Sequence, residues 1–257
     1  MQEQDVYFDE AALGGFHQIH IEITPQQLLV DMFVPTERQE AYEKQQELDE
    51  YMTTVFHDRA TEANRSYLEV VGSTIDWQNL QTILYYEEDT KHEYSFFVAL
   101  SDSQNDCTIQ ARVNKTTFKS SSPSNMEVLD APSIQQDHLS QELYLSDCYD
   151  WLLKQLIAPA TDLLHQRYKA QLEQGKTLYF NHLKLQKEGL LLSKGSWVFR
   201  KKSIVPWQEL KIERAGNTYI ISDKKDPRFK AIVPKKSFRN KDVFIRLING
   251  FTTNESV

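Results

Sequence analysis

Basic side chains gather at three places in the last third of the chain. One group lies in a predicted strand, the second borders a loop, and the third precedes the last predicted helix. If the three groups meet on one rim, that rim can bind a phosphate-bearing ligand, an anionic lipid or nucleic acid. Few aromatic residues are interleaved among them, so nucleic acid is the least favoured of these ligands. The candidate binding residues are Arg200, Lys201, Lys202, Lys224, Lys225, Arg228, Lys230, Lys235, Lys236 and Arg239.

Histidine and carboxylate side chains are the other candidates for chemistry. His17, His20 and His57 would have to meet the acidic run 87–89 in space to build a catalytic or metal site. On a strand, residues three apart point to opposite faces, so His17 and His20 are not expected to share a metal. A solvated turn is the favoured interpretation of 87–89. We therefore predict no metal site and no catalytic residue, with an enzyme built on these groups as an alternative.

Motifs that usually accompany enzymatic activity are absent from the sequence. It contains no glycine-rich phosphate loop, no G-x-S-x-G, no H-E-x-x-H and no EF-hand loop. No glycine occurs between Gly72 and Gly175, and backbone that approaches a phosphate closely usually needs glycine. Cys107 and Cys148 form no C-x-x-C pair, and two reduced thiols are favoured over one disulfide. The sequence favours a protein without catalytic activity and without a cofactor.

Charge is distributed very unevenly along the chain. Residues 1–173 hold 11 Lys and Arg against 30 Asp and Glu, a net charge of −19. Residues 174–257 hold 18 against 7, a net charge of +11. Opposite signs predict two units with different surfaces, an acidic α+β domain at 1–173 and a basic domain at 176–257. The two can dock on each other, which we favour, or each can meet a partner of opposite charge.

Hydrophobic periodicity predicts the elements of the acidic part. Residues 1–14 look loosely ordered, and alternation at 16–23 and 28–34 predicts a hairpin. A capping box at Thr36 and Gln39 begins a predicted helix that runs to about Tyr67. Further strands are expected at 80–86, 94–100 and 108–113, and a long loop at 119–137. A second long helix is predicted over 136–173, kinked or split by Pro159.

The basic part predicts short antiparallel strands followed by one helix. The strands are expected at 177–185, 189–193, 196–205, 207–213, 219–222 and 229–233. Apolar residues at i, i+3, i+4 and i+7 predict an amphipathic final helix, which Asn240 or Ser237 can cap and Gly250 can close. Overall the fold class is α+β, a mixed N-terminal unit followed by a small antiparallel sheet covered by a helix.

Three runs in the basic part resemble the YcxB-like family of bacterial proteins. They are EGL at 188–190, IVPWQEL at 204–210 and IVPKKSF at 232–238. The resemblance covers roughly 180–250 and implies a pleckstrin-homology-like arrangement, a bent sheet covered by a helix. Family members commonly carry two transmembrane helices before this module, and no such pair occurs in this chain. The family has no established catalytic residues to transfer.

Together these observations predict a non-enzymatic binding or regulatory protein. The partner is expected to be another protein or an anionic ligand. One alternative is an immunity or inhibitor protein whose acidic N-terminal surface blocks a basic toxin or nucleic-acid enzyme. Another is a peripheral protein of the membrane surface. Because the longest apolar runs are too short to span a bilayer and the chain starts MQEQD, we expect no transmembrane segment and a cytoplasmic location.

Overall fold

The computed structural model describes residues 3–9, 13, 15, 17–56, 66–72, 74–115, 138–194 and 201–253. The fold is α+β, as the sequence predicts, and the chain forms two compact units. The first comprises Met1–Asp76, Glu87–Phe97 and Asn105–Leu152; the second comprises Trp77–Tyr86, Val98–Gln104 and Leu153–Val257. These ranges differ from the predicted 1–173 and 176–257, because the second unit takes in three segments of the acidic part, 77–86, 98–104 and 153–173.

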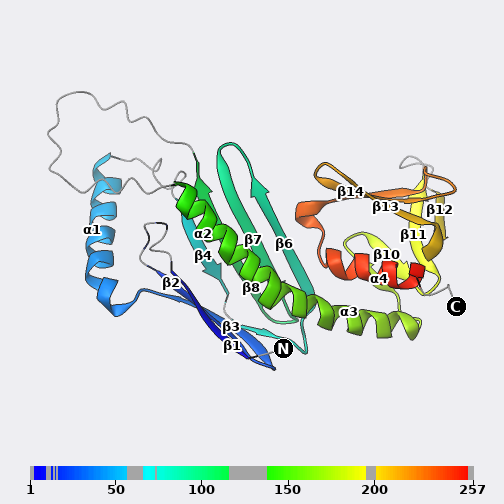
Figure 1. Cartoon of the computed structure of the whole chain (residues 1–257), viewed down its shortest axis with the longest axis horizontal. Coiled ribbons are helices and arrows are strands. Elements are labelled where there is room, and N and C mark those ends of the chain that lie inside the picture. The colour runs from blue at the N-terminus through cyan, green and yellow to red at the C-terminus, as the bar shows by residue number, and fades with distance from the viewer. Residues whose placement is uncertain are drawn as a thin grey trace. The chain divides into compact units, whose positions relative to one another are not determined.

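One antiparallel sheet has the strand order β1-β2-β3-β5, and Figure 1 labels its strands β1, β2 and β3. Its strands are β1 (Gln4–Asp9), β2 (Gln18–Ile23), β3 (Gln27–Phe33) and β5 (Thr74–Asp76). The predicted hairpin is confirmed as β2 and β3, and the Thr24 hydroxyl oxygen accepts the Gln27 backbone N–H across its turn (3.0 Å). The expectation of a loosely ordered start is wrong over β1, which pairs with β2 along its whole length.

The first helix is shorter than its sequence pattern predicts. A 3-10 turn at Thr36–Arg38 leads into α1 (Gln39–Phe56). The predicted capping box is not formed: Thr36 lies inside the 3-10 turn, which Pro35 begins without a side-chain capping hydrogen bond, and the Gln39 amide donates to Glu43 (2.9 Å). The predicted end at Tyr67 is also wrong, because Tyr67 begins strand β4. Residues 57–65 lie outside the described part of the chain.

A second antiparallel sheet has the order β4-β8-β7-β6. Its strands are β4 (Tyr67–Val71), β6 (Thr82–Asp89), β7 (Glu93–Ser101) and β8 (Asp106–Asn114). Burial alternates along β7 and β8, as expected of strands with one face in a core. The strands predicted at 80–86, 94–100 and 108–113 are confirmed. The loop predicted at 119–137 lies outside the described residues.

Helix α2 (His138–Trp151) passes through a π-helical stretch, Leu152–Ile157, into α3 (Ala158–Glu173). Within the first unit, the Tyr149 ring of α2 stacks on Phe96 of β7, with the ring centres 5.3 Å apart. Because α2, the π-helical stretch and α3 run without a break over 138–173, the second predicted long helix is confirmed. Pro159 does not split it, because this residue lies in the first turn of α3 and the π-helical stretch before it accommodates the missing N–H.

The second unit contains a seven-stranded antiparallel sheet. Its order is β13-β14-β15-β11-β10-β9, and β12 pairs with β11. The strands are β9 (Leu178–Phe180), β10 (Leu183–Gln186), β11 (Gly189–Lys194), β12 (Lys201–Pro206), β13 (Leu210–Ala215), β14 (Thr218–Asp223) and β15 (Lys230–Pro234). The single strand predicted at 177–185 is instead a hairpin of β9 and β10, with Asn181 at positive φ (+54°) between them.

Helix α4 (Lys241–Thr253) ends the described chain and packs its apolar face into the core of the second unit. Val243, Phe244, Leu247 and Ile248 are buried, and the Phe244 ring contacts those of Phe180 and Phe238. The predicted amphipathic helix is confirmed, but Gly250 does not close it, since the helix continues to Thr253. Short 3-10 turns at Trp207–Glu209 and Lys235–Ser237 follow Pro206 and Pro234.

Hydrogen bonds tie Trp77–Tyr86 to the helices of the second unit. The Arg167 guanidinium donates to the carbonyls of Leu80 (2.5 Å) and Trp77 (3.0 Å). The Asn240 side chain accepts the Ile83 N–H (2.6 Å) and donates to the Gln81 carbonyl (2.9 Å). The Asn240 side chain, which was predicted to cap α4, therefore bonds backbone groups of Gln81 and Ile83 instead. No helix in the described residues is long and apolar enough to cross a membrane.

Candidate functional site: a basic groove

The sheet of the second unit has an inner face and an outer face that differ in chemistry. On β10 and β11, Leu183, Leu185, Leu190 and Leu192 are buried. Because side chains alternate along a strand, the residues between them point to the opposite, outer face. This alternation places Lys184, Leu191 and Ser193 on the outer face, away from the core that α4 covers.

Strand register then sets which outer side chains are neighbours. Lys184 lies opposite Tyr179 on β9 and Leu191 on β11. Ser193 lies opposite Lys202 on β12 and Lys230 on β15. Directly paired residues share a face, with Cβ atoms about 5 Å apart. Lys202 and Lys230 therefore flank Ser193 on two strands, close enough for both ammonium groups to reach one anion above it.

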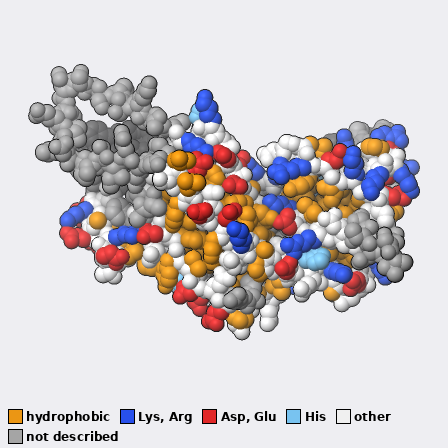
Figure 2. Space-filling view, viewed as in Figure 1, with side chains coloured by type: hydrophobic (Ala, Val, Ile, Leu, Met, Phe, Trp, Pro, Cys, Tyr) orange, Lys and Arg blue, Asp and Glu red, His pale blue; other side chains and the backbone are white. Residues whose placement is uncertain are grey.

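This outer face is hollowed into a groove of about 630 Å³, which we call the basic groove. None of its described lining residues is acidic. Its polar lining consists of His182, Lys184, Ser193, Lys194, Lys202, Arg228 and Lys230. Its apolar lining consists of Tyr179, Leu183, Leu191, Leu192, Ala231 and Ile232. In Figure 2, Lys and Arg side chains (blue) lie beside hydrophobic ones (orange) on the visible face of the second unit.

The cations of the groove fall into two classes. Lys194 and Arg228 share one carboxylate, Asp226, with N–O distances of 2.7 Å for each. The hydrogen bonds from Arg228 and then Lys194 hold the pKa of Asp226 well below its ordinary value. Lys184, Lys202 and Lys230, by contrast, have no ion pair with any described residue. Three lysines therefore keep uncompensated charge on one concave face.

The predicted rim residues divide between this groove and other places. Lys202, Arg228 and Lys230 line the groove, whereas Lys201 alternates to the other side of its strand. The Lys224 ammonium donates to the Gln208 carbonyl, and Lys225 pairs with Glu209. Lys235, Lys236 and Arg239 lie at the turn before α4, where the Lys236 ammonium is 5.4 Å from the centre of the Tyr86 ring. Arg200 lies outside the described residues.

Sequence reasoning missed Lys184, Lys194 and His182 as groove residues. Lys184 stands alone between apolar residues of its strand, whereas the predicted rim was built from lysines and arginines clustered in sequence. The signal was present in the alternation of 183–186, where Lys184 is the outward residue between two leucines. The turn at Lys187 and Glu188 brings Lys184 beside Leu191 of β11, and the turn at Asn181 and His182 brings it beside Tyr179 of β9.

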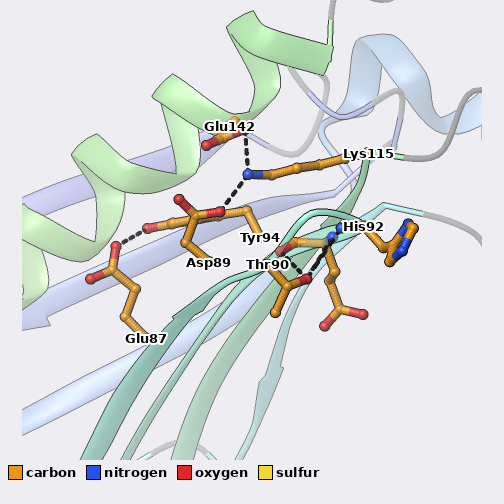
Figure 3. Close-up of polar contacts among 8 residues, drawn as sticks. Glu87, Asp89, Thr90, His92, Tyr94, Lys115 and Glu142 are labelled. Atoms are coloured by element: carbon orange, nitrogen blue, oxygen red, sulfur yellow. Dashed lines mark hydrogen bonds and ion pairs between the residues drawn. The ribbon is translucent and has the colours of Figure 1, made fainter. Parts of the chain in front are cut away.

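A second polar cluster lies in the first unit, where the end of β6 meets α2 (Figure 3). The Lys115 ammonium contacts Asp89 at 2.6 Å and Glu142 at 2.9 Å, and the Tyr94 hydroxyl donates to Glu87 at 2.9 Å. Burial lowers the pKa of Lys115, but the hydrogen bonds to the two carboxylates outweigh it and the net pKa is raised. Glu87 and Asp89 thus have partners within the protein, unlike the solvated turn favoured from sequence.

Replacing Lys115 with methionine is expected to destabilise the first unit by about 1 kcal/mol, because two carboxylates lose their shared cation in a partly exposed site. Urea unfolding at low and high salt measures the effect, which should shrink in high salt. Lys91→Met is the matched control, since exposed Lys91 has no ion pair with a described residue. Equal losses in the two variants would contradict this account.

The described histidines do not gather around these acids. His20 contacts Asp5 and stacks on Tyr7 (ring centres 4.6 Å apart), and the His17 ring lies against Tyr42. The His92 ring points away from Asp89 and Glu142 in Figure 3. Among the described residues, no three His, Cys, Asp or Glu side chains are placed to hold a metal ion. His57 lies outside the described part of the chain.

Both cysteines are free and buried. Burial raises the pKa of Cys107 to about 12, and it raises that of Cys148 to about 11. Such thiols stay protonated near neutral pH and make weak nucleophiles.

No protein-family model, no curated protein and no solved structure matches this chain. The YcxB-like resemblance therefore depends on the runs at 188–190, 204–210 and 232–238 alone.

Proposed function

We propose that this protein is a non-catalytic binding protein whose second unit holds a phosphate-bearing ligand in the basic groove. The observation that carries the proposal is the set of three lysines, Lys184, Lys202 and Lys230, on one concave outer face without an acidic partner among the described residues. Like charges held together on a concave surface raise its potential and favour a bound anion.

The geometry suits one compact anion with several oxygens. Lys202 and Lys230 approach the position above Ser193 from opposite sides, and Arg228 and Lys194 stand at the border of the groove. Asp226 holds these last two side chains in place through three hydrogen bonds of 2.7–2.9 Å. Charge-assisted hydrogen bonds from several directions are what a phosphate group accepts most readily.

The chemistry of the lining favours binding over catalysis. The described lining contains cations, one imidazole, the hydroxyls of Ser193 and Tyr179 and apolar side chains, and neither a carboxylate nor a thiol. His182, at the hairpin turn, is the single histidine of the described lining, and histidine is the side chain most often used as a general acid or base. General acid–base catalysis usually needs a second group to orient or complement such a residue. A groove of this composition can bind and orient an anion, but its described residues offer no acid–base pair to catalyse a reaction of that anion.

The proposal includes a YcxB-like identity and a pleckstrin-homology-like arrangement for the second unit. Seven antiparallel strands, β9 to β15, followed by the helix α4 support that arrangement. The family-like runs also occupy structural positions: Gly189 starts β11, and Pro206 and Pro234 each precede a 3-10 turn. A cytoplasmic location remains part of the same proposal.

The acidic surface of the first unit is the weaker candidate for recognition. Several of its carboxylates already pair with cations of the same unit, such as Asp9 with Arg38 and Glu93 with Arg112. An inhibitor that blocks a basic enzyme would need such acids free for its partner. Among the described residues, the basic groove is a formed concavity that suits the opposite case, an anionic ligand on a basic surface.

Isothermal titration of the full chain with pyrophosphate at low ionic strength tests the proposal. The double variant Lys202→Gln/Lys230→Gln should bind about tenfold more weakly, since two charge-assisted contacts are lost. Lys224→Gln/Lys225→Gln removes the same charge outside the groove and should change affinity less than about twofold. Equal losses in both doubles, or no binding by the unaltered protein, would overturn the proposal.

A further inference from the structure

The outer face of the second unit carries exposed hydrophobic side chains as well as lysines. Its described residues include three exposed large hydrophobic side chains, Tyr179 (68%), Ile204 (44%) and Ile232 (50%). Tyr179 and Ile232 line the basic groove, and Ile204 lies opposite Leu191, which also lines it. Exposed hydrophobic residues scattered singly over a surface need no explanation, but here all three belong to one hollowed face.

Strand register sorts these side chains into two rows across the sheet. The first row runs Tyr179, Lys184, Leu191, Ile204 over strands β9 to β12. The second row is Lys230, Ser193, Lys202 on β15, β11 and β12. Leu191 and Ser193 are two residues apart on β11, so the rows are separated by about 6.6 Å. A mainly apolar strip thus runs beside a basic strip.

From this arrangement we propose that the ligand is an amphiphilic phosphomonoester, a phosphate group joined to an apolar body. This inference rests on the proposed function and names its ligand class. The phosphate lies over Ser193 between Lys202 and Lys230, and the apolar body extends over Leu191 toward Tyr179, with Ile232 beside it. Lys184, in the apolar row, can contact an ester or hydroxyl oxygen near the junction.

Physical complementarity favours this ligand class over a bare anion. An inorganic phosphate would satisfy the basic row but would leave the apolar row in water. Burying a few methylene groups against Leu191, Ile204 and Ile232 adds affinity that the bare anion lacks, about tenfold or more for a short alkyl chain. The groove volume of about 630 Å³ is of the size that holds small organic ligands.

Titration of the full chain with inorganic phosphate and with hexyl phosphate tests the inference. We expect hexyl phosphate to bind at least about tenfold more tightly than phosphate. In Ile204→Ser/Ile232→Ser this ratio should fall toward about one, because the apolar row is removed. Met32→Ser/Phe33→Ser, which removes exposed hydrophobic side chains from the first unit, is the matched control and should keep the ratio. Circular dichroism of each variant checks that it is folded.

The outcomes separate this inference from the proposed function. Equal affinities for phosphate and hexyl phosphate would overturn the amphiphilic ligand while leaving a phosphate-binding groove. Loss of the preference in the control pair as well would also overturn it, since the preference would then arise elsewhere. If neither phosphate nor hexyl phosphate binds, and pyrophosphate does not either, both proposals fall.

The source of the phosphomonoester is distinguished by sedimentation with phosphatidylcholine vesicles, with and without phosphatidic acid. Sedimentation that requires phosphatidic acid and is lost in Ile204→Ser/Ile232→Ser places the ester in a membrane. Tight binding of hexyl phosphate without such sedimentation places it in solution. Both results support an amphiphilic phosphomonoester, whereas sedimentation with phosphatidylcholine vesicles alone that phosphatidic acid does not increase contradicts recognition of the phosphate.

Discussion

Replacing Gly189 with alanine is expected to destabilise the second unit by about 3 kcal/mol or more. A Cβ atom added to Gly189 would lie 2.1 Å from the Val205 carbonyl oxygen and 2.8 Å from its carbon. Both atoms belong to the backbone of β12, which pairs with β11 along six residues. The φ of Gly189, +156°, is also one that residues with a side chain rarely adopt. Relief of the clash therefore requires the two strands to separate.

Urea unfolding followed by circular dichroism measures this effect. Gly216→Ala is the matched control, since Gly216 also has positive φ (+51°) but no atom within 4 Å of an added Cβ. The control should lose only about 1 kcal/mol, the cost of the backbone conformation. Similar losses for the two variants would show that close approach of β12 does not explain Gly189. Because β11 and β12 carry Ser193 and Lys202, Gly189→Ala should also weaken pyrophosphate binding.

Replacing Asn240 with alanine is expected to cost about 2–4 kcal/mol of stability. The Asn240 side chain accepts the Ile83 N–H and donates to the Gln81 carbonyl, and its own N–H donates to the Ile83 carbonyl (2.7 Å). Asn240 is buried and its φ is +55°, a conformation that asparagine tolerates better than alanine does. Alanine would leave the buried Ile83 N–H without its acceptor.

A glycine at position 240 separates the contribution of the side-chain hydrogen bonds from that of the positive φ. Asn240→Gly loses the same side-chain hydrogen bonds but adopts positive φ freely, so it should lose less than the alanine variant by about 1 kcal/mol. Thermal unfolding by calorimetry ranks the three proteins. If Asn240→Ala unfolds within about 0.5 kcal/mol of the unaltered protein, the hydrogen bonds to Gln81 and Ile83 do not stabilise the second unit.

Elements with a strong local period were predictable from the sequence. The alternation of apolar residues in β7 and β8, and the helical spacing in α3 and α4, depend on neighbours within a few residues. Strand β1 was missed because its short acidic sequence gains its structure from pairing with β2. The β9–β10 turn was missed because Asn181, without Gly or Pro beside it, is a weaker turn signal.

Tertiary contacts explain the larger differences between the predicted and the observed units and site. The segment Trp77–Tyr86 belongs to the second unit through hydrogen bonds with Arg167, Tyr168 and Asn240, which are about 80 to 160 positions away in the sequence. No local pattern encodes such pairings. Local sequence patterns also fail to identify the candidate site. Lysines adjacent in sequence, such as Lys224 and Lys225, lie outside the groove. Lys184, Lys202 and Lys230 come together only through strand register.

The most direct test of the central claim, that the basic groove binds an anion, is nitrogen-15 NMR of the full chain during titration with pyrophosphate at low ionic strength. The account predicts that the largest shifts occur at backbone amides of Lys184, Leu191, Ser193, Lys202 and Lys230, and that in Lys202→Gln/Lys230→Gln they require about tenfold more pyrophosphate. Shifts confined to the turn at 235–239 or to Lys224 and Lys225, or no shifts at all, would contradict it.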